Sequence, residues 1–324
     1  MRKLFKTLAI VWCVMYLIGT VCFFSIGNFI YSFALLRESV FSRENVIAFF
    51  TGTEPDSAQY SGTEEQEKTW IEINSEEKYI LSQDGLSLHG YFTNNPLSQS
   101  RYAIVCHGYS GQAKHMSYYA NKLYNMGFSV LCPDARAHGK SEGNVTGMGY
   151  LERKDIILWI NEIIKNDPQA QILLFGVSMG GATVLFTSGE SNLPSCVKAV
   201  ISDCAFTRVY EEIGNAIRGY VPFLPDFPLV DSASVVCEIR GGYSFRDASC
   251  IEAVEKSTTP TLFIHGSADT FVPFYMLDQL YNSASCVKEK LVIDSAGHAR
   301  SAVTNPELYW NTVENFAAKY MQSN

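Results

Sequence analysis

The sequence contains no C-x-x-C pair, and its six histidines are scattered through 324 residues, so the spacing typical of a zinc site is absent. Positive charge is also scarce. Against 33 acidic residues there are 25 lysines and arginines, which gives a net charge of −8. No basic block follows the first few residues, and this argues against a nucleic-acid partner. Hydrophobic residues make up 47% of the chain, enough for a full core, which excludes general disorder.

The nine cysteines follow no regular spacing. Five of them lie within or at the ends of apolar runs: Cys13, Cys22, Cys106, Cys132 and Cys204. Such positions favour small buried thiols over disulfide bridges. A late pair among Cys237, Cys250 and Cys286 is the bridge that the sequence leaves open.

Charge is missing altogether from residues 7–36. This stretch is longer than the roughly 20 residues that a helix needs to cross the hydrocarbon core, and longer than the apolar region of about 7 to 15 residues in a cleaved signal peptide. We therefore expect residues 1–50 to form a membrane anchor and its juxtamembrane segment. Cleavage at a small-x-small site, at 25–27 or 32–34, is the alternative.

Basic residues flank the apolar stretch unequally. Arg2, Lys3 and Lys6 precede it, whereas Arg37 and Arg43 follow it. The positive-inside rule therefore places the N-terminus inside and the bulk of the chain on the extracytoplasmic side of a single-pass anchor. The next segment, residues 51–70, is polar and acidic and is interpreted as a linker.

From residue 71 to 324 the pattern is that of one α/β domain. WIEINS (70–75), KYILS (78–82) and LSLHGYF (86–92) predict strands, the last two as a hairpin. Six short apolar runs then predict parallel strands covered on both faces: YAIVC (102–106), FSVLCPD (128–134), ILLFG (172–176), KAVISD (198–203), TLFIHG (261–266) and KLVID (290–294). Helical patterns alternate with them at 113–126, 150–166, 180–190 and 306–321. The expected fold is a mixed, mostly parallel sheet with helices on both faces.

One interval is too long for a simple connection. About 55 residues separate KAVISD from TLFIHG, whereas two to six residues are usual for a loop between strand and helix. The interval contains an amphipathic segment (TRVYEEIGNAIRGY), a proline-interrupted apolar segment (VPFLPDFPLV) and a helical pattern near 232–240. We expect a helical cap at about 207–258, inserted after the sixth strand and over the strand ends. An ordinary crossover with extra helices is the alternative.

The segment LLFGVSMGGA (173–182) places Ser178 between a strand and a helix. This is the context of a nucleophile elbow, in which a strained turn lifts a serine hydroxyl out of the sheet. Such a turn brings the residues two before and two after the serine together, so both must be small. Here they are Gly176 and Gly180.

A serine hydroxyl becomes a good nucleophile when a histidine, held by a carboxylate, removes its proton. The chain order for this architecture is serine, acid, histidine. Of the histidines only His298, in DSAGHAR, follows a credible acid. Asp269, in the loop after TLFIHG, is the preferred acid and Asp203 the reserve. The other histidines, within strands, turns or a helix face, have structural interpretations.

Two backbone N–H groups are needed to stabilise the oxyanion of the tetrahedral intermediate. One is expected from Met179, at the start of the helix after Ser178. The other is expected from Tyr109, in the loop CHGYSGQ that follows the strand YAIVC.

The motifs IVCHGYSG, CPDARAHGKSEG, FGVSMGG, LFIHGSADTFVP and DSAGHA, in this order, resemble the α/β-hydrolase superfamily. The chain is most similar to its membrane-anchored bacterial serine hydrolases, which resemble monoacylglycerol lipases and cinnamoyl esterases. The resemblance implies a catalytic triad of Ser178, Asp269 and His298, an oxyanion hole of Tyr109 and Met179, and no metal or organic cofactor. Within CPDARAHGKSEG, the residues Asp134, Arg136, Gly139 and Ser141 match a structural turn of the superfamily. Ala137 departs from the glycine of many relatives, which should affect loop shape only.

The expected function is hydrolysis of a small-molecule carboxylic ester through an acyl-enzyme. A serine peptidase is the main rival, because Glu211, Glu212 and Asp226 in the cap leave open a site for a free amine. A thioesterase is a third possibility, and an inactive binding module is opposed by the complete set of triad residues. Apolar cap residues suggest an acyl-chain site or the core of the cap itself: Val221, Phe223, Leu224, Phe227 and Leu229.

Overall fold

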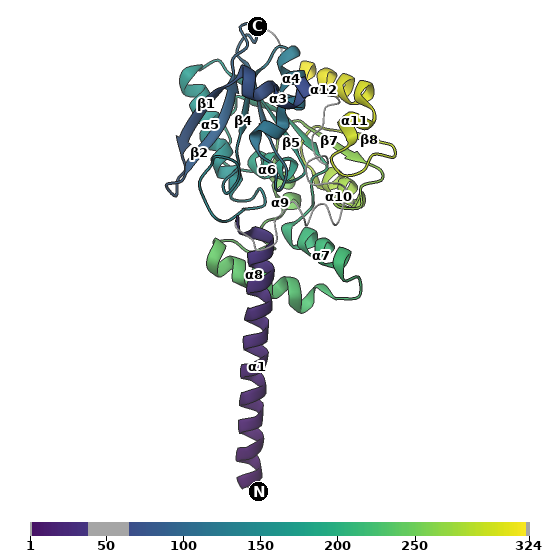
Figure 1. The fold of residues 1–324 in the computed structure, drawn as a ribbon. Helices are drawn as coiled ribbons and strands as arrows, with labels where there is room; N and C mark the ends of the chain where they lie inside the picture. Colours follow the sequence, from purple (N-terminus) through teal and green to yellow (C-terminus); the bar gives the residue numbers. More distant parts are fainter. Residues whose placement is uncertain (1, 38–64, 322–324) are drawn as a thin grey trace.

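The computed structural model describes residues 2–37 and 65–321, and its centre is an eight-stranded sheet (Figure 1). The strands follow the order β1-β2-β4-β3-β5-β6-β7-β8. Their bounds are β1 Glu76–Leu81, β2 Ser87–Thr93, β3 Arg101–Cys106, β4 Ser129–Pro133, β5 Gln171–Val177, β6 Val197–Asp203, β7 Thr261–Gly266 and β8 Lys288–Ile293. β1 and β2 form an antiparallel hairpin, β2 is antiparallel to β4, and all other pairs are parallel. The expectation of a mixed, mostly parallel sheet is confirmed.

Helices cover both faces of this sheet, because successive strand residues point to opposite sides. Ile172 and Leu174 belong to one core and Leu173 and Phe175 to the other. The first core is closed by α5 Glu152–Asn166, α6 Met179–Ser188, α9 Cys250–Lys256 and α10 Tyr275–Ser283. The second is closed by α3 Glu65–Asn74, the 3₁₀ helix η1 Ala113–Met116, α4 Ser117–Asn125, α11 Ser301–Thr304 and α12 Pro306–Tyr320.

The strand expected at WIEINS is wrong, because its first five residues are the end of helix α3. The alternation of Ile71 and Ile73 suggested a strand with one buried face. In the structure Ile71 is buried against α4, whereas Ile73 is 75% exposed. The linker predicted at 51–70 is therefore helical from residue 65, and residues 51–64 lie outside the described residues.

The long interval after β6 contains three helices with two different roles. α7 Val209–Tyr220 and α8 Asp226–Gly241 form the cap, at the end of the domain from which the N-terminal helix projects (Figure 1). α9 instead packs against α6 and α10 and acts as the crossover helix that leads into β7. Phe223 lies between α7 and α8 and is 82% exposed. Phe227 lies in the first turn of α8 and is 71% exposed. The interpretation of these two side chains as cap core is therefore wrong.

All nine cysteines are free thiols in the structure. Cys237 and Cys250 are buried and Cys286 is half-buried, so the late disulfide that the sequence left open is not formed.

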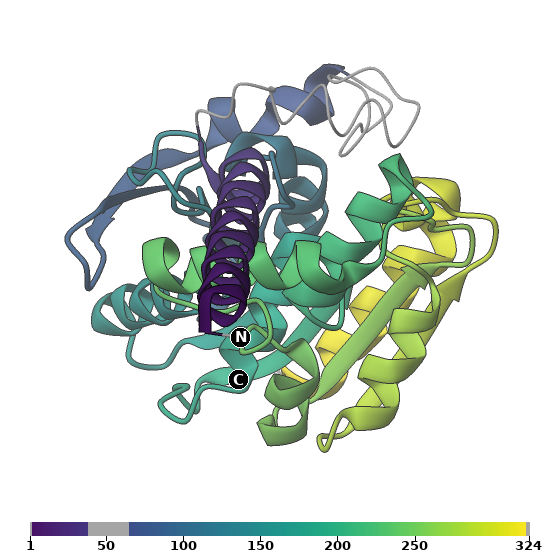
Figure 2. The ribbon, with the colours of Figure 1, turned by 90° about the horizontal axis from the view of Figure 1, so that it is seen from below.

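The N-terminal helix α1, Arg2–Leu35, is continuous and apolar enough to cross a membrane. Its first two-thirds are exposed, but its last third is packed against the domain. Gly27, Tyr31 and Leu35, spaced four residues apart on one face, are buried where α8 crosses α1 (Figure 2). A Cβ atom at Gly27 would overlap the backbone carbonyl of Ser232, so only glycine allows this close crossing.

Replacing Leu35 with alanine tests whether the end of α1 belongs to the core. Leu35 is fully buried, so its truncation leaves a cavity and should lower the free energy of unfolding by about 3 kcal/mol. The measurement is thermal unfolding of the full-length protein in detergent. Leu8→Ala is the matched control, because Leu8 on the same helix is 50% exposed. Equal melting temperatures for the two variants would contradict the packing described here.

Candidate active site

Ser178 lies on a sharp bend between β5 and α6, with a φ angle of 58° and a ψ angle of −120°. A positive φ is unfavourable for a residue with a side chain, so close packing must hold it in place. The Ser178 N–H donates to the carbonyl of Asp203 on β6 (2.8 Å). A Cβ atom at Gly176 would overlap the Gly180 carbonyl, and a Cβ at Gly180 would overlap the Cys106 carbonyl. Both glycines are therefore required for the bend to form against β3.

His298 and Asp269 reach Ser178 from two loops at the same sheet edge. His298 follows β8 and Asp269 follows β7, and these strands are parallel neighbours. His298 Nε2 is 2.9 Å from Ser178 Oγ, and His298 Nδ1 is 2.8 Å from Asp269 Oδ2. The three residues predicted from the sequence thus form one hydrogen-bonded chain.

The Asp269 carboxylate is buried and well satisfied. Its Oδ1 accepts hydrogen bonds from the N–H groups of Phe271 and Val272 (3.0 Å each), and His265 Nε2 lies 3.2 Å from its Oδ2. Burial alone would raise the pKa of this carboxyl, but the charges and hydrogen bonds of His298 and His265 outweigh burial and lower it. Asp269 is therefore ionised at neutral pH and fixes the imidazole through Nδ1.

The reserve acid, Asp203, is not in hydrogen-bond contact with His298. It is fully buried behind the site, where its Oδ2 accepts a hydrogen bond from the Tyr309 hydroxyl (2.9 Å). Burial raises the pKa of Asp203 to about 6. The Asp203 carboxylate thus binds Tyr309, and only the Asp203 backbone carbonyl contacts Ser178.

The two expected oxyanion donors flank the bend. β3 pairs with β5 so that Cys106 lies opposite Gly176, and the loops that follow these strands leave the sheet side by side. Met179 is the first residue of α6, where backbone N–H groups are not used by the helix. Tyr109 lies in the neighbouring loop, and its hydroxyl donates to the carbonyl of Ala34 in α1 (2.5 Å). Their role as donors stays a prediction.

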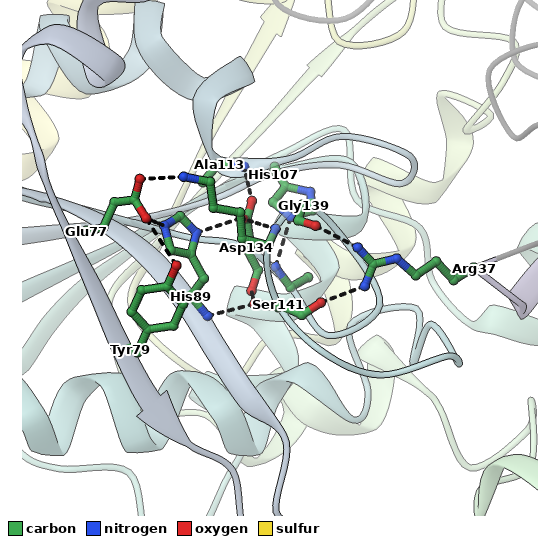
Figure 3. Close-up of polar contacts among 11 residues, drawn as sticks. Arg37, Glu77, Tyr79, His89, His107, Ala113, Asp134, Gly139 and Ser141 are labelled. Atoms are coloured by element: carbon green, nitrogen blue, oxygen red, sulfur yellow. Dashed lines mark hydrogen bonds and ion pairs between the residues drawn. The ribbon is translucent and has the colours of Figure 1, made fainter.

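A buried polar network around Asp134 supports the loop that carries Tyr109 (Figure 3). Asp134 Oδ1 accepts from the Ala113 N–H (2.6 Å), and its Oδ2 accepts from the Lys140 N–H (2.9 Å) and lies 2.7 Å from His89 Nδ1. Burial would raise the pKa of Asp134, but the His89 hydrogen bond and the His107 charge outweigh it and lower the pKa. The carboxylate thus ties together β2, the loop after β3 and the turn after β4.

The turn after β4 agrees with its structural interpretation. The Arg136 guanidinium is bound by Asp155 (2.8 Å) and Asp84 (2.9 Å). A Cβ at Gly139 would overlap the Asp134 carboxylate, and Ala137 adopts a positive φ of 60°. The effect of alanine at this position on the shape of the turn stays a prediction.

The histidines given structural interpretations have structural partners. His107 Nε2 accepts from the Ala135 N–H (3.0 Å), which leaves its Nδ1 to donate to the Gly108 carbonyl. His138 binds the Arg136 carbonyl, and His115 lies 3.4 Å from Gln112 Nε2. His265 differs from the other structural histidines because it contacts Asp269, a residue of the triad. Its place at the end of β7, four residues before the acid, is the sequence signal that could have identified it.

The acidic residues of the cap do not form a cluster. Glu211 is paired with Arg208 (2.9 Å), and Asp226 is paired with Arg218. Glu212 is different: it is only 5% exposed, and its Oε2 has no partner among the described residues. Burial, with the charge of Asp269, raises the pKa of Glu212 well above its ordinary value. This side chain is therefore neutral at pH values where an exposed glutamate is charged.

Among the described residues, Cys204 and the triad members Asp269 and His298 form the group that could offer metal ligands. Donor atoms of Cys204, Asp269 and His298 lie within 4.8 Å of one another. Burial raises the pKa of the Cys204 thiol well above its ordinary value, and both His298 nitrogens are occupied by Ser178 and Asp269. A neutral thiol and an engaged imidazole make a poor donor set.

One family model and several known proteins are similar to this chain. Residues 99–225 match the model of the serine aminopeptidase family S33. The chain is 29% identical to the uncharacterized protein YqkD of Bacillus subtilis over 242 residues, covering 73% of this chain and 77% of the relative. It is 24% identical to the uncharacterized membrane protein YNL320W of Saccharomyces cerevisiae, covering 75% of this chain and 80% of the relative.

A solved structure extends the likeness in fold. The Pyrococcus furiosus esterase Pf2001 superposes with a TM-score of 0.62 and 22% identity, covering 81% of this chain and 98% of that chain. At this identity the likeness concerns the fold alone.

Adding one methyl group at Gly176 tests the packing of the bend. Gly176→Ala forces the Gly180 carbonyl away and should lower the free energy of unfolding by about 2 kcal/mol. Gly297→Ala is the control, because a Cβ at Gly297, beside His298, meets open space. Thermal unfolding of both variants measures the difference. If the two melt at the same temperature, the close approach of Gly176 and Gly180 is not a constraint.

Proposed function

Because the chain belongs to the α/β-hydrolase superfamily, we propose that it is a serine hydrolase that cleaves carboxylic esters through Ser178, His298 and Asp269. The observation that supports this proposal is the pair of hydrogen bonds that joins Ser178 Oγ to His298 and His298 to Asp269. A histidine in contact with both a hydroxyl and a buried carboxylate can accept the hydroxyl proton and hold it as an imidazolium.

The proposed reaction has two halves. Ser178 Oγ attacks the ester carbonyl carbon while its proton passes to His298 Nε2, and the carbonyl oxygen becomes an oxyanion between the N–H groups of Tyr109 and Met179. His298 then gives the proton to the leaving alcohol as the C–O bond breaks, which leaves Ser178 acylated. Water attacks the acyl-enzyme by the same route, and the carboxylic acid is released. Asp269 stays ionised and stabilises the imidazolium in both halves.

A peptidase is the alternative that a comparison favours, because the matching family model is that of a serine aminopeptidase. An aminopeptidase must bind a free ammonium group, which needs a charged carboxylate. Glu211 and Asp226 are already paired with arginines, and Glu212 is neutral because of its burial. This distribution of charge supports the ester as substrate over a peptide with a free amine. A thioester would be cleaved by the same chemistry as an ester.

We also propose that α1 is retained and anchors the chain in a membrane, with the catalytic domain on the extracytoplasmic side. The exposed part of α1, up to about Ile26, is long enough to cross the hydrocarbon core. Cleavage at 25–27 or 32–34 would remove Gly27 or Tyr31 from their contacts with the domain, which argues against a removed signal. The exposed Phe223 and Phe227 of the cap lie in a segment at the same end of the domain (Figure 1).

Substitution of the triad tests the mechanism. Ser178→Ala and His298→Ala should each lower kcat for p-nitrophenyl esters by about 10⁴-fold to 10⁶-fold, because either change removes the activated nucleophile. Asp269→Asn should lower kcat by about 10⁴-fold, because the amide no longer holds the imidazole in the required tautomer. Asp203→Asn serves as the comparison. A larger loss of kcat from Asp203→Asn than from Asp269→Asn would show that Asp269 is not the acid of the triad.

Assays with two classes of substrate distinguish an esterase from an aminopeptidase. The wild-type protein should hydrolyse p-nitrophenyl esters and leave aminoacyl p-nitroanilides nearly uncleaved. Glu212→Gln should change kcat/KM for esters by no more than about twofold, because a neutral carboxyl and an amide have similar shape and charge. Efficient cleavage of the anilides by the wild-type protein, lost in Glu212→Gln, would contradict the ester proposal.

A further inference from the structure

We propose that the end of α1 is a working part of the active site, and that Tyr109 is the positioning residue through which α1 holds the oxyanion loop. The proposal rests on the proposed function, because it assigns Tyr109 an effect on the same reaction. It gives the membrane helix a role beyond attachment. Three sets of contacts carry it.

The first set fixes the end of α1 to the cap. Tyr31 and Leu35 are 1% and 0% exposed, and Gly27 lies against the backbone of Ser232 in α8. The Arg240 guanidinium of α8 stacks on the Tyr31 ring, 4.7 Å from its centroid. A simple tether would need none of these contacts. The helix is therefore held at a fixed height and rotation relative to the domain.

The second set joins the helix terminus to the oxyanion loop. The last carbonyls of a helix have no partner within the helix. Here the catalytic domain supplies partners: the Tyr109 hydroxyl donates to the Ala34 carbonyl (2.5 Å), and the Thr146 N–H donates to the Leu35 carbonyl (2.8 Å). Tyr109 thus has its backbone N–H at the proposed oxyanion position and the far end of its side chain on α1. A residue held at both ends has little freedom to rotate its peptide plane.

The third set of contacts supports the C-terminal end of the loop 107–112. Arg37 donates to the carbonyls of Ser141 (2.7 Å) and Gly139 (2.6 Å), in the turn after β4 (Figure 3). Ser141 Oγ in turn donates to the Asp134 carbonyl (2.7 Å), and the Asp134 carboxylate accepts from the Ala113 N–H. Ala113 follows directly on the loop 107–112. The residues at the end of α1 therefore support this loop at Tyr109 itself and, through Asp134, at its C-terminal end.

Two substitutions in the full-length protein, assayed in detergent micelles or native membranes, test the proposal. Tyr109→Phe keeps the ring and the N–H group but removes the hydroxyl that binds Ala34. It should lower kcat for p-nitrophenyl butyrate by about tenfold and change KM by less than about twofold, because an oxyanion donor acts mainly in the transition state. The affinity for a trifluoromethyl ketone, which forms a tetrahedral adduct, should fall by a similar factor.

Gly27→Leu and its matched control extend the test to α1 itself. Gly27→Leu pushes α1 away from α8 and should lower kcat and the affinity for the ketone in the same direction as Tyr109→Phe. Gly19→Leu adds the same side chain where no atom lies within 4 Å of the added Cβ, and should leave both values at the wild-type level. A purely structural role would lower the melting temperature of Tyr109→Phe without this selective loss in kcat.

The outcomes separate this proposal from the proposed function. If wild type is active and Tyr109→Phe matches Gly19→Leu in kcat and ketone affinity, α1 is only an anchor and the proposal is overturned. If Gly27→Leu fails to fold, Tyr109→Phe alone decides. If wild type neither cleaves esters nor reacts with a fluorophosphonate at Ser178, the proposed function fails, and the proposal fails with it.

Discussion

The bend at Ser178 brings three backbone segments within contact distance, and the rest of the site is arranged around this approach. Gly176 at the end of β5, Gly180 in the first turn of α6 and Cys106 at the end of β3 leave no room for a Cβ atom between them. The N–H of Ser178 is at the same time bound to β6. The strained φ angle of Ser178 is therefore stabilised by the sheet itself, and the hydroxyl stands at its carboxyl edge.

Because the strands from β3 to β8 are parallel where they carry the site, all the loops that supply polar groups emerge at this same edge. β7 and β8 deliver Asp269 and His298, and β3 delivers the loop with Tyr109. The three buried acids differ in protonation. Two histidines keep Asp269 ionised, whereas burial raises the pKa values of Asp203 and Glu212. A charged carboxylate in contact with the imidazole that faces the serine is the electrostatic arrangement that acyl transfer requires.

The positions of the strands and of the motifs along the chain can be predicted from the sequence, because both follow from local patterns, whereas the order of the strands in the sheet comes from the structure. The glycines around Ser178 signalled the bend, and the positions of Asp269 and His298 after neighbouring strands signalled their meeting. The helix at 65–74 is not evident from the sequence, because Ile71 and Ile73 alternate with polar residues as in a strand, although only Ile71 is buried. The contacts of α1 were missed for a different reason. Gly27, Tyr31 and Leu35 share a helix face, but an uncharged stretch gives no sign of which face meets protein rather than lipid.

The contact between Tyr109 and Ala34 could not be foreseen from any pattern, because it joins a side chain to a backbone carbonyl 75 residues away. This contact also gives the N-terminal helix α1 a connection to the active-site loop. The most direct test of the catalytic account is a structure of the full-length protein after reaction with a fluorophosphonate. The account predicts phosphorus bonded to Ser178 Oγ, with the phosphonyl oxygen about 3 Å from the backbone nitrogens of Tyr109 and Met179. An adduct on another residue, or an oxygen turned away from both nitrogens, would contradict it.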